Sequence, residues 1–203
     1  MTDSATTVPA TFDAPAVLAQ ISEATAHLLT SAAELTEEEL RGPSLCEGWT
    51  RGHVLAHLAR NADGQANMLN TAATGKVTPM YASDEQRDAD IEAGAFRSGA
   101  ELLADLRDSA ARYARAYADV DAAKAWGAPV YRTPGAAPMP AFQTPGKRLA
   151  ELLIHHVDLD ADFTPAHWSD TSRRRTWSTA CAPSPTTRRR SRCAGRSGRC
   201  WPG

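Results

Sequence analysis

Residues 44–61 of this 203-residue chain read SLCEGWTRGHVLAHLARN, and this stretch decides the fold class. A Gly-Trp turn is followed by Thr50, a residue type that caps helix N-termini because its hydroxyl accepts a backbone N–H. We expect a helix from Thr50 to about Thr71. Its buried side is supplied by apolar residues at helical spacing, Val54, Leu55, Leu58, Ala62, Met68 and Leu69. The same helix carries His53 and His57 one turn apart.

The rest of the chain up to residue 168 has the same helical character, in four helical segments of which the third is interrupted. Besides the helix above, we expect helices over residues 14–35, 84–95, 99–120 and 144–160. Between the last two, residues 126–143 are rich in Pro and Gly, which prevents regular helix and leaves an unusually long loop. Only residues 128–132 alternate as a strand would. The sequence therefore predicts a mainly α protein, a four-helix bundle with a long loop before its last helix.

Residues 169–203 differ sharply from the rest of the chain. They contain nine arginines, one acidic residue and no Leu, Ile, Val or Phe, so residues 1–168 carry a net charge of −10. A segment without aliphatic side chains cannot offset the entropy lost on ordering its backbone. We therefore expect residues 1–168 to be the folded domain and residues 169–203 to be an Arg-rich tail that is disordered or encoded out of frame. The alternative is a natural basic tail that binds nucleic acid or an acidic partner.

Several classes of protein are excluded for the folded domain. No run of apolar residues is long enough to cross a bilayer, and the N-terminus lacks the basic and apolar regions of a secretion signal. An acidic domain is a poor ligand for nucleic acid, since phosphate contacts require clustered cations. Cys46 is the only cysteine before residue 169, so a disulfide framework is excluded and a cytoplasmic location is expected.

Two pairs of residues could bind a metal ion. His53 and His57 lie four residues apart, and so do Glu151 and His155, so each pair can present two ligands from one helix face. Two histidines with one carboxylate would suit zinc and would leave a fourth position open. Spacing alone leaves the alternative open, because histidine pairs arise by chance and His53, in the first turn of its helix, is well placed to bond local backbone.

Three ordered blocks of the sequence resemble the mycothiol-dependent maleylpyruvate isomerase family. The first is residues 44–61, the second is TPMY at residues 78–81 followed by Arg87, and the third is ELLIHHVDL at residues 151–159. The resemblance extends over roughly residues 12–165. It implies a DinB-like four-helix bundle that holds one divalent metal ion, usually zinc.

The resemblance also implies the ligands and the reaction. The metal ligands would be His57, Glu151 and His155, with His53 as a neighbour and the loop at residues 126–143 near the mouth of the site. Mycothiol would be the thiol cofactor, and maleylpyruvate, an intermediate of gentisate degradation, would be isomerised from cis to trans to give fumarylpyruvate. Family members share the metal site but differ in substrate, so a related metal- and mycothiol-dependent reaction remains open.

Two further expectations concern catalysis. Arg87 can clamp a substrate carboxylate, because its planar guanidinium forms two parallel hydrogen bonds, or it can form a surface ion pair with Asp84 or Asp90. Family members continue into a second domain, for which residues 169–203 are no substitute. The alternative function is therefore a catalytically impaired module that binds metal and thiol.

Overall fold

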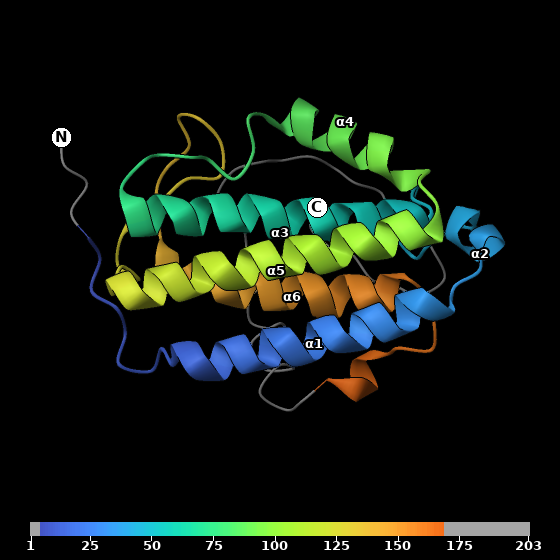
Figure 1. Ribbon diagram of the computed structural model, residues 1–203, viewed down its shortest axis with the longest axis horizontal. Coiled ribbons are helices and arrows are strands. Elements are labelled where there is room, and N and C mark those ends of the chain that lie inside the picture. The colour runs from blue at the N-terminus through green and yellow to red at the C-terminus, as the bar shows by residue number, and fades with distance from the viewer. Residues whose placement is uncertain (1–4, 169–203) are drawn as a thin grey trace. The chain divides into compact units, whose positions relative to one another are not determined.

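The computed structural model describes residues 5–168 of the chain. Within these residues, four long helices lie side by side as a bundle (Figure 1). They are α1 (Ala14–Glu34), α3 (Arg51–Thr74), α5 (Gly99–Ala123) and α6 (Thr144–Asp158). Helices α1 and α6 run in one direction, and α3 and α5 run in the other. The predicted four-helix bundle is confirmed.

Shorter elements connect these four helices. They are α2 (Glu37–Arg41), α4 (Asp84–Ala95), β1 (Pro129–Val130), β2 (Met139–Pro140), η1 (Ala141–Gln143) and η2 (Pro165–His167). Helix α4 lies against the outer side of α3 and belongs to the crossover that lets α5 run parallel to α3 (Figure 1). The sequence analysis missed α2, which begins with a capping box in which Thr36 and Glu39 bond each other's backbone N–H.

Side-chain caps explain why the long helices begin where they do. Asp13 accepts from the N–H of Ala16, and the Thr50 hydroxyl accepts from the N–H of His53. Ser98 and Glu101 form the predicted capping box of α5. The observed helix boundaries lie within about three residues of the predicted ones, a normal uncertainty for helix ends.

The core of the bundle is formed by the predicted apolar faces of the long helices. All six residues assigned to the buried side of α3 are buried, as are Val17, Ile21 and Leu28 on α1. Burial of these side chains removes apolar surface from water, which is the dominant favourable contribution to folding. Helix α3 is buried along most of its length because α4, α5 and α6 all pack against it.

The long loop before α6 is paired with itself and bonded to two other parts of the fold. Its two short strands pair antiparallel, with Val130 opposite Met139. Just past β1, the carbonyls of Tyr131 and Arg132 accept from the N–H groups of Met80 and Tyr81, both at 2.9 Å. At the start of the loop, Gly127 accepts from the N–H of Thr6 at 2.7 Å, and a Cβ at Gly127 would collide with the Thr6 carbonyl oxygen. The weak alternation at residues 128–132 therefore marked a real but very short strand.

By its internal contacts the chain divides into residues 1–164 and residues 165–203. Of the second part, the structure describes η2 and Trp168, whose N–H donates to the Pro165 carbonyl. The predicted tail, residues 169–203, lies outside the described residues. Among the helices that are described, none is both long and apolar enough for a membrane span.

Candidate functional site

His57, Glu151 and His155 lie together between α3 and α6. His57 Nε2 is 2.9 Å from Glu151 Oε2, and His155 Nε2 is 3.3 Å from the same oxygen. The two histidine rings meet edge to face, with centroids 4.6 Å apart. Because α3 and α6 run in opposite directions, the first third of α3 faces the C-terminal half of α6. Packing of these two helices thus brings the predicted trio to one point.

The ionisation states of the trio are set by burial and by mutual hydrogen bonds. Burial opposes the ionisation of Glu151, but hydrogen bonds from His155 and His57 outweigh burial and hold the pKa of this carboxyl far below its usual range. Burial also lowers the pKa of His57, so this imidazole is neutral. For His155 burial is opposed by hydrogen bonds with Asp158, Cys46 and Glu151, which raise its pKa well above the usual value. Without a metal, the site holds an imidazolium between two carboxylates.

The donor atoms of the trio fit a small divalent metal ion. They lie within 4.8 Å of one another, and the two measured donor separations are 2.9 and 3.3 Å. Tetrahedral zinc with bonds of about 2.0–2.1 Å would place its donors roughly 3.3 Å apart, so only a small expansion is needed. Two imidazoles and one carboxylate leave the fourth position open for water or a thiol.

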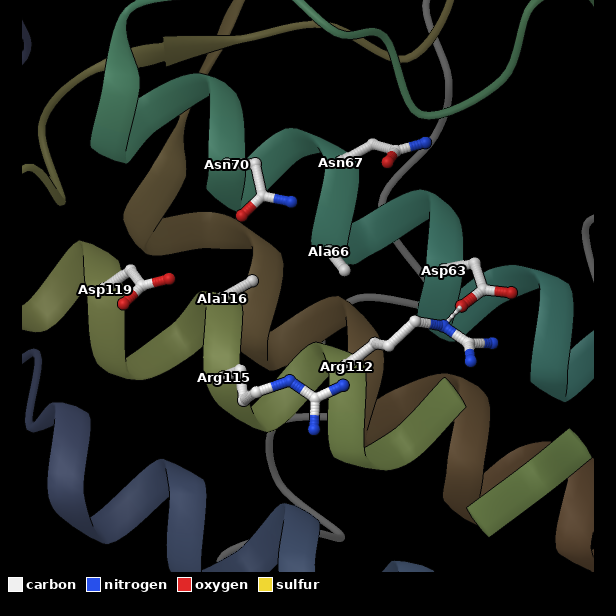
Figure 2. Close-up of a pocket in the computed structure, with 8 residues that line it drawn as sticks. All are labelled: Asp63, Ala66, Asn67, Asn70, Arg112, Arg115, Ala116 and Asp119. Carbon is white, nitrogen blue, oxygen red and sulfur yellow. Dashed lines mark hydrogen bonds and ion pairs between the residues drawn. The ribbon is translucent and has the colours of Figure 1, made fainter. Parts of the chain in front are cut away.

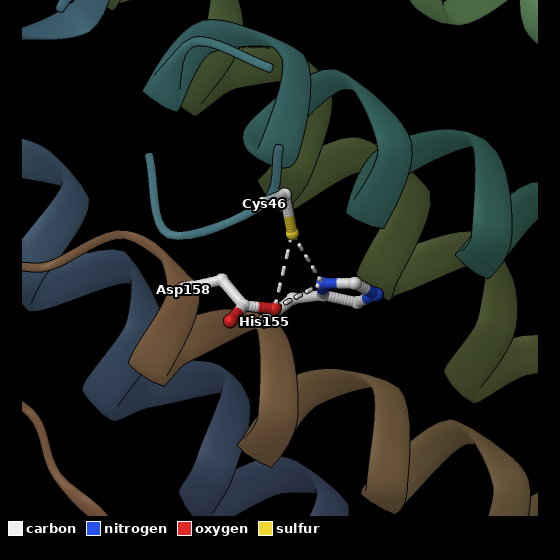
Figure 3. Close-up of side chains that lie close together, drawn as sticks. All are labelled: Cys46, His155 and Asp158. Carbon is white, nitrogen blue, oxygen red and sulfur yellow. Dashed lines mark hydrogen bonds and ion pairs between the residues drawn. The ribbon is translucent and has the colours of Figure 1, made fainter. Parts of the chain in front are cut away.

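A second group, which the sequence analysis missed, adjoins the trio through His155 (Figure 3). Asp158 Oδ2 lies 2.9 Å from His155 Nδ1 and also accepts a hydrogen bond from the Cys46 thiol at 3.2 Å. This carboxylate accepts from His155 Nδ1 and thereby orients the ring so that Nε2 faces Glu151. The spacing of three residues from His155 could have indicated Asp158, whereas Cys46 reaches it from a distant part of the sequence.

Burial dominates the environment of the Cys46 thiol. It raises the pKa of Cys46, so the group remains a neutral thiol at neutral pH. The loop that carries Cys46 is fixed to the end of α6, since the Leu45 N–H donates to the Asp158 carbonyl at 2.9 Å. Cys46 therefore acts here as a hydrogen-bond donor that holds the Asp158 carboxylate in place.

Arg87 extends from α4 to the edge of the trio. Its Nη2 lies 3.4 Å from His57 Nδ1, and its Nη1 is 2.6 Å from Asp88 Oδ1. The surface ion pair considered from the sequence therefore exists, but its partner is Asp88 rather than Asp84 or Asp90. The arginine reaches the trio and the surface at once, with 23% of its side chain exposed.

His53 lies outside the trio, as its position in the first turn of α3 predicts. Its Nδ1 is 3.3 Å from the Thr50 backbone nitrogen and 2.7 Å from the Thr50 hydroxyl. Its Nε2 is 3.0 Å from Glu92 Oε2 on α4. His53 thus links the start of α3 to α4, and both of its ring nitrogens are occupied.

A groove of about 450 Å³ lies between α3 and α5, away from the trio (Figure 2). Its lining includes Asp63, Asn67 and Asn70 on α3 and Arg112, Arg115 and Asp119 on α5. The Arg112 side chain points toward Asp63, and its Nε donates to Asp63 Oδ1 at 2.7 Å. None of the site residues predicted from the sequence lines this groove.

The comparisons with known proteins agree with this geometry. Residues 9–160 match the family described as Mycothiol maleylpyruvate isomerase N-terminal domain. Two solved structures of the mycothiol-dependent maleylpyruvate isomerase are similar to the chain. One is of a histidine-to-alanine variant and is 31% identical to the chain; the other, for which no substitution is named, is 32% identical. Each has a TM-score of 0.74 and covers 80% of this chain and 67% of its own. No protein of curated function matches.

The family match extends from the loop before α1 to beyond the end of α6, so it includes every helix of the bundle and all three residues of the trio. The bundle has the DinB-like fold. The family match covers most of the chain, and the solved relatives share about a third of its sequence, so the similarity is one of sequence as well as of fold. The chain belongs to the mycothiol-dependent maleylpyruvate isomerase family.

Proposed function

We propose that the chain catalyses a metal- and mycothiol-dependent cis–trans isomerisation, with maleylpyruvate as substrate and fumarylpyruvate as product. The observation that carries the proposal is the trio itself, a partly buried set of two imidazoles and a carboxylate with an arginine 3.4 Å from one imidazole. The family and the solved relatives support the same reaction class.

The residues that would hold the metal are His57, Glu151 and His155. A zinc ion bound by this set would favour the thiolate form of a coordinated thiol, which is the nucleophile that the reaction needs at neutral pH. Glu151 is already in the anionic form that binds metal. His57 is neutral, but it has to give up the Nε2 proton that it donates to Glu151 before Nε2 can bind the metal. His155 has to release the proton on its Nε2, while Asp158 retains the one on Nδ1.

Bound mycothiol would supply a thiolate for reversible addition to the carbon–carbon double bond of maleylpyruvate, which would make that bond single, allow rotation and restore it as trans when the thiolate leaves. The reaction would therefore balance with no net gain or loss of atoms. Arg87 would bind a carboxylate of the substrate throughout, because it lies beside the trio and its guanidinium can form two parallel bonds.

The alternative function is a module that binds metal and thiol without efficient turnover. It is favoured by one observation, since a third of the length of the solved relatives has no counterpart in the match. Residues from that part would have to be dispensable for the first proposal to hold.

An assay of maleylpyruvate isomerisation by the zinc-loaded chain, with and without mycothiol, separates the two functions. The first proposal expects turnover that requires mycothiol, that is lost in His57→Ala and that is largely retained in the matched control His53→Ala. Full zinc occupancy without mycothiol-dependent turnover would favour the binding module. A wild-type chain that binds no divalent metal at all would contradict both functions.

A further inference from the structure

Two arginines from different parts of the fold flank one tyrosine ring beside the trio. The guanidinium carbon of Arg87, on α4, lies 6.0 Å from the centroid of the Tyr81 ring. That of Arg132, which follows β1 in the long loop, lies 5.6 Å from the same centroid. Both guanidiniums are therefore within cation–π distance of one ring.

Backbone hydrogen bonds fix this arrangement. The Met80 and Tyr81 N–H groups donate to the carbonyls of Tyr131 and Arg132, so the two extended segments lie beside each other. On the other side, Gly64 of α3 leaves room for the Tyr81 segment, because a Cβ there would lie 2.7 Å from Met80 Cγ and 2.9 Å from the Met80 oxygen. The Tyr81 segment thus packs against α3, and backbone hydrogen bonds hold the Arg132 segment beside it.

The charges of this cluster are unusual for a purely structural contact. Two like charges that face one ring repel each other, and the carboxylates that offset them lie toward solvent. Asp84 pairs with Arg132 at 2.6 Å, and Asp88 pairs with Arg87 at the same distance. The two aspartate side chains are 61% and 67% exposed, so an anionic ligand could replace either of them at little cost.

Of the two arginines at the Tyr81 ring, Arg87 also contacts His57 of the trio. Arg132 contacts the same ring from the long loop. Half of the Arg132 side chain is exposed, so it is accessible from solvent. A ligand with one carboxylate could use Arg87 alone. A short ligand with two carboxylates could use both arginines, of which Arg87 also reaches the trio.

We infer that Arg132 is a second substrate-binding residue, which with Arg87 and Tyr81 selects short dicarboxylates over monocarboxylates. This inference rests on the proposed function for the position of the reacting centre, but the binding it describes requires neither mycothiol nor turnover. Arg132 would bind the carboxylate that Arg87 does not reach, and Tyr81 would hold both guanidiniums in place. The selectivity would come from the second pair of charge-assisted hydrogen bonds.

The test is calorimetric binding of maleate and of its monomethyl ester to the zinc-loaded 203-residue chain without mycothiol. In Arg132→Gln we expect the affinity for maleate to fall by about 10-fold or more and the affinity for the monoester to change by less than about 2-fold. Arg132→Lys should recover part of the loss, because it restores the charge without the planar fork. The matched control is Arg107→Gln, which removes the same charge from an exposed position on α5 and should alter neither affinity.

Asp84→Asn distinguishes a binding role from a structural one. If Arg132 only holds the loop, loss of its carboxylate partner should leave the affinity for maleate unchanged or lower it. If Arg132 binds the ligand, the variant should bind maleate more tightly, because a competing carboxylate has been removed. Circular dichroism spectra that match the wild type would establish that each variant is folded.

Any of three binding results would overturn the inference. The first is that the wild type shows no detectable binding of maleate. The second is that Arg132→Gln loses as much affinity for the monoester as for maleate, and the third is that Asp84→Asn does not bind maleate more tightly than the wild type. None of these depends on isomerase activity. Mycothiol-dependent turnover that is indifferent to Arg132→Gln would likewise contradict the inference while the proposed function stands. The reverse result, selective maleate binding without turnover, would support the inference and contradict the isomerase proposal.

Discussion

Helix α3 contributes to two polar regions, the trio and the groove, which differ in their partner helices, their packing and their charges. To the trio α3 contributes the buried His57, whose partners lie on α6. To the groove it contributes Asp63, among others, whose partner lies on α5. Asp63 is six residues after His57 and so points about 120° away around the helix. The groove is a hollow of about 450 Å³, whereas the trio is a tight cluster of side chains.

The two regions also differ in how far their charged groups are shifted from their ordinary pKa values. In the groove Arg112 is paired with Asp63, and this hydrogen bond raises the pKa of the arginine further into the range where it stays charged. In the trio hydrogen bonds and neighbouring charges outweigh burial, and they drive the pKa of a carboxylate far down and that of a histidine far up. Perturbed ionisation, rather than the volume of a hollow, marks the region suited to chemistry.

The largest expected effect is the loss of metal from the trio. His57→Ala should reduce the zinc content of the purified chain from about one ion per chain to background, because two protein ligands cannot hold zinc against water. Arg112→Ala in the groove should leave the zinc content unchanged, and so should His53→Ala. Zinc content measured by mass spectrometry after dialysis checks this. Equal zinc in wild type and His57→Ala would show that the trio is not the metal site.

The next effect concerns buried and exposed charge. Arg148 on α6 is buried, and its Nη1 donates to the Leu58 carbonyl and to Asn61 Oδ1, each at 2.9 Å. Arg148→Met would leave both acceptors buried without this donor, which should lower the free energy of unfolding by about 2–4 kcal/mol. Arg115→Met at the groove should change it by less than about 0.5 kcal/mol. Urea denaturation of the zinc-free proteins measures both, and similar small losses would refute the distinction.

A third prediction uses the raised pKa of His155. Above the ordinary histidine pKa the unfolded chain has released this proton while the folded chain still binds it, so stability falls as pH rises. His57 has a lowered pKa and is neutral in both states in this range, so it does not contribute. Above about pH 7 the zinc-free protein should lose up to about 1.4 kcal/mol per pH unit from His155 alone, until the folded chain also releases this proton.

Asp158→Asn tests the cause of that pH dependence. It removes the carboxylate at His155 Nδ1, so the slope of stability against pH should become shallower. Urea midpoints at several pH values provide the measurement, with Asp63→Asn in the groove as the control that keeps the wild-type slope. A slope that is the same in both variants would mean that Asp158 does not set the protonation of His155.

The smallest effect is expected in the groove. Arg112 pairs with Asp63 while 44% of its side chain is exposed, so the pair is screened by water and salt. Arg112→Ala should cost less than about 1 kcal/mol of stability, and this cost should shrink further in high salt. A loss of several kcal/mol would show that the groove, too, is a structural centre of the bundle.

The sequence predicted what depends on neighbours along one helix. The His57 helix, the Glu151–His155 pair and the role of His53 in capping all follow from spacings of three or four residues. Which faces of α3 and α6 meet is a matter of packing, and the resemblance to a known family supplied that part. The assignment of the trio as metal ligands, and of Arg87 as a carboxylate clamp, stays a prediction.

Contacts between distant segments could not be predicted. Cys46 meets Asp158 only because the loop before α3 bonds to the end of α6. Arg132 meets Tyr81 only because two irregular segments pair through their backbones. Neither spacing nor periodicity carries information on such contacts, since they depend on the docking of elements that are already formed.

The pairing of residues 80–81 with residues 131–132 has a consequence for how the molecule opens. The wall beside the trio, formed by the paired segments 80–81 and 131–132, is held by a few backbone hydrogen bonds outside the regular helices. The two segments can therefore separate from each other while the bundle stays intact. Amide hydrogen exchange at Met80 and Tyr81 would report this separation directly, because each N–H is protected only while the two segments are paired. The rate of exchange at these two amides thus measures how often the wall beside the trio comes apart, independently of global unfolding.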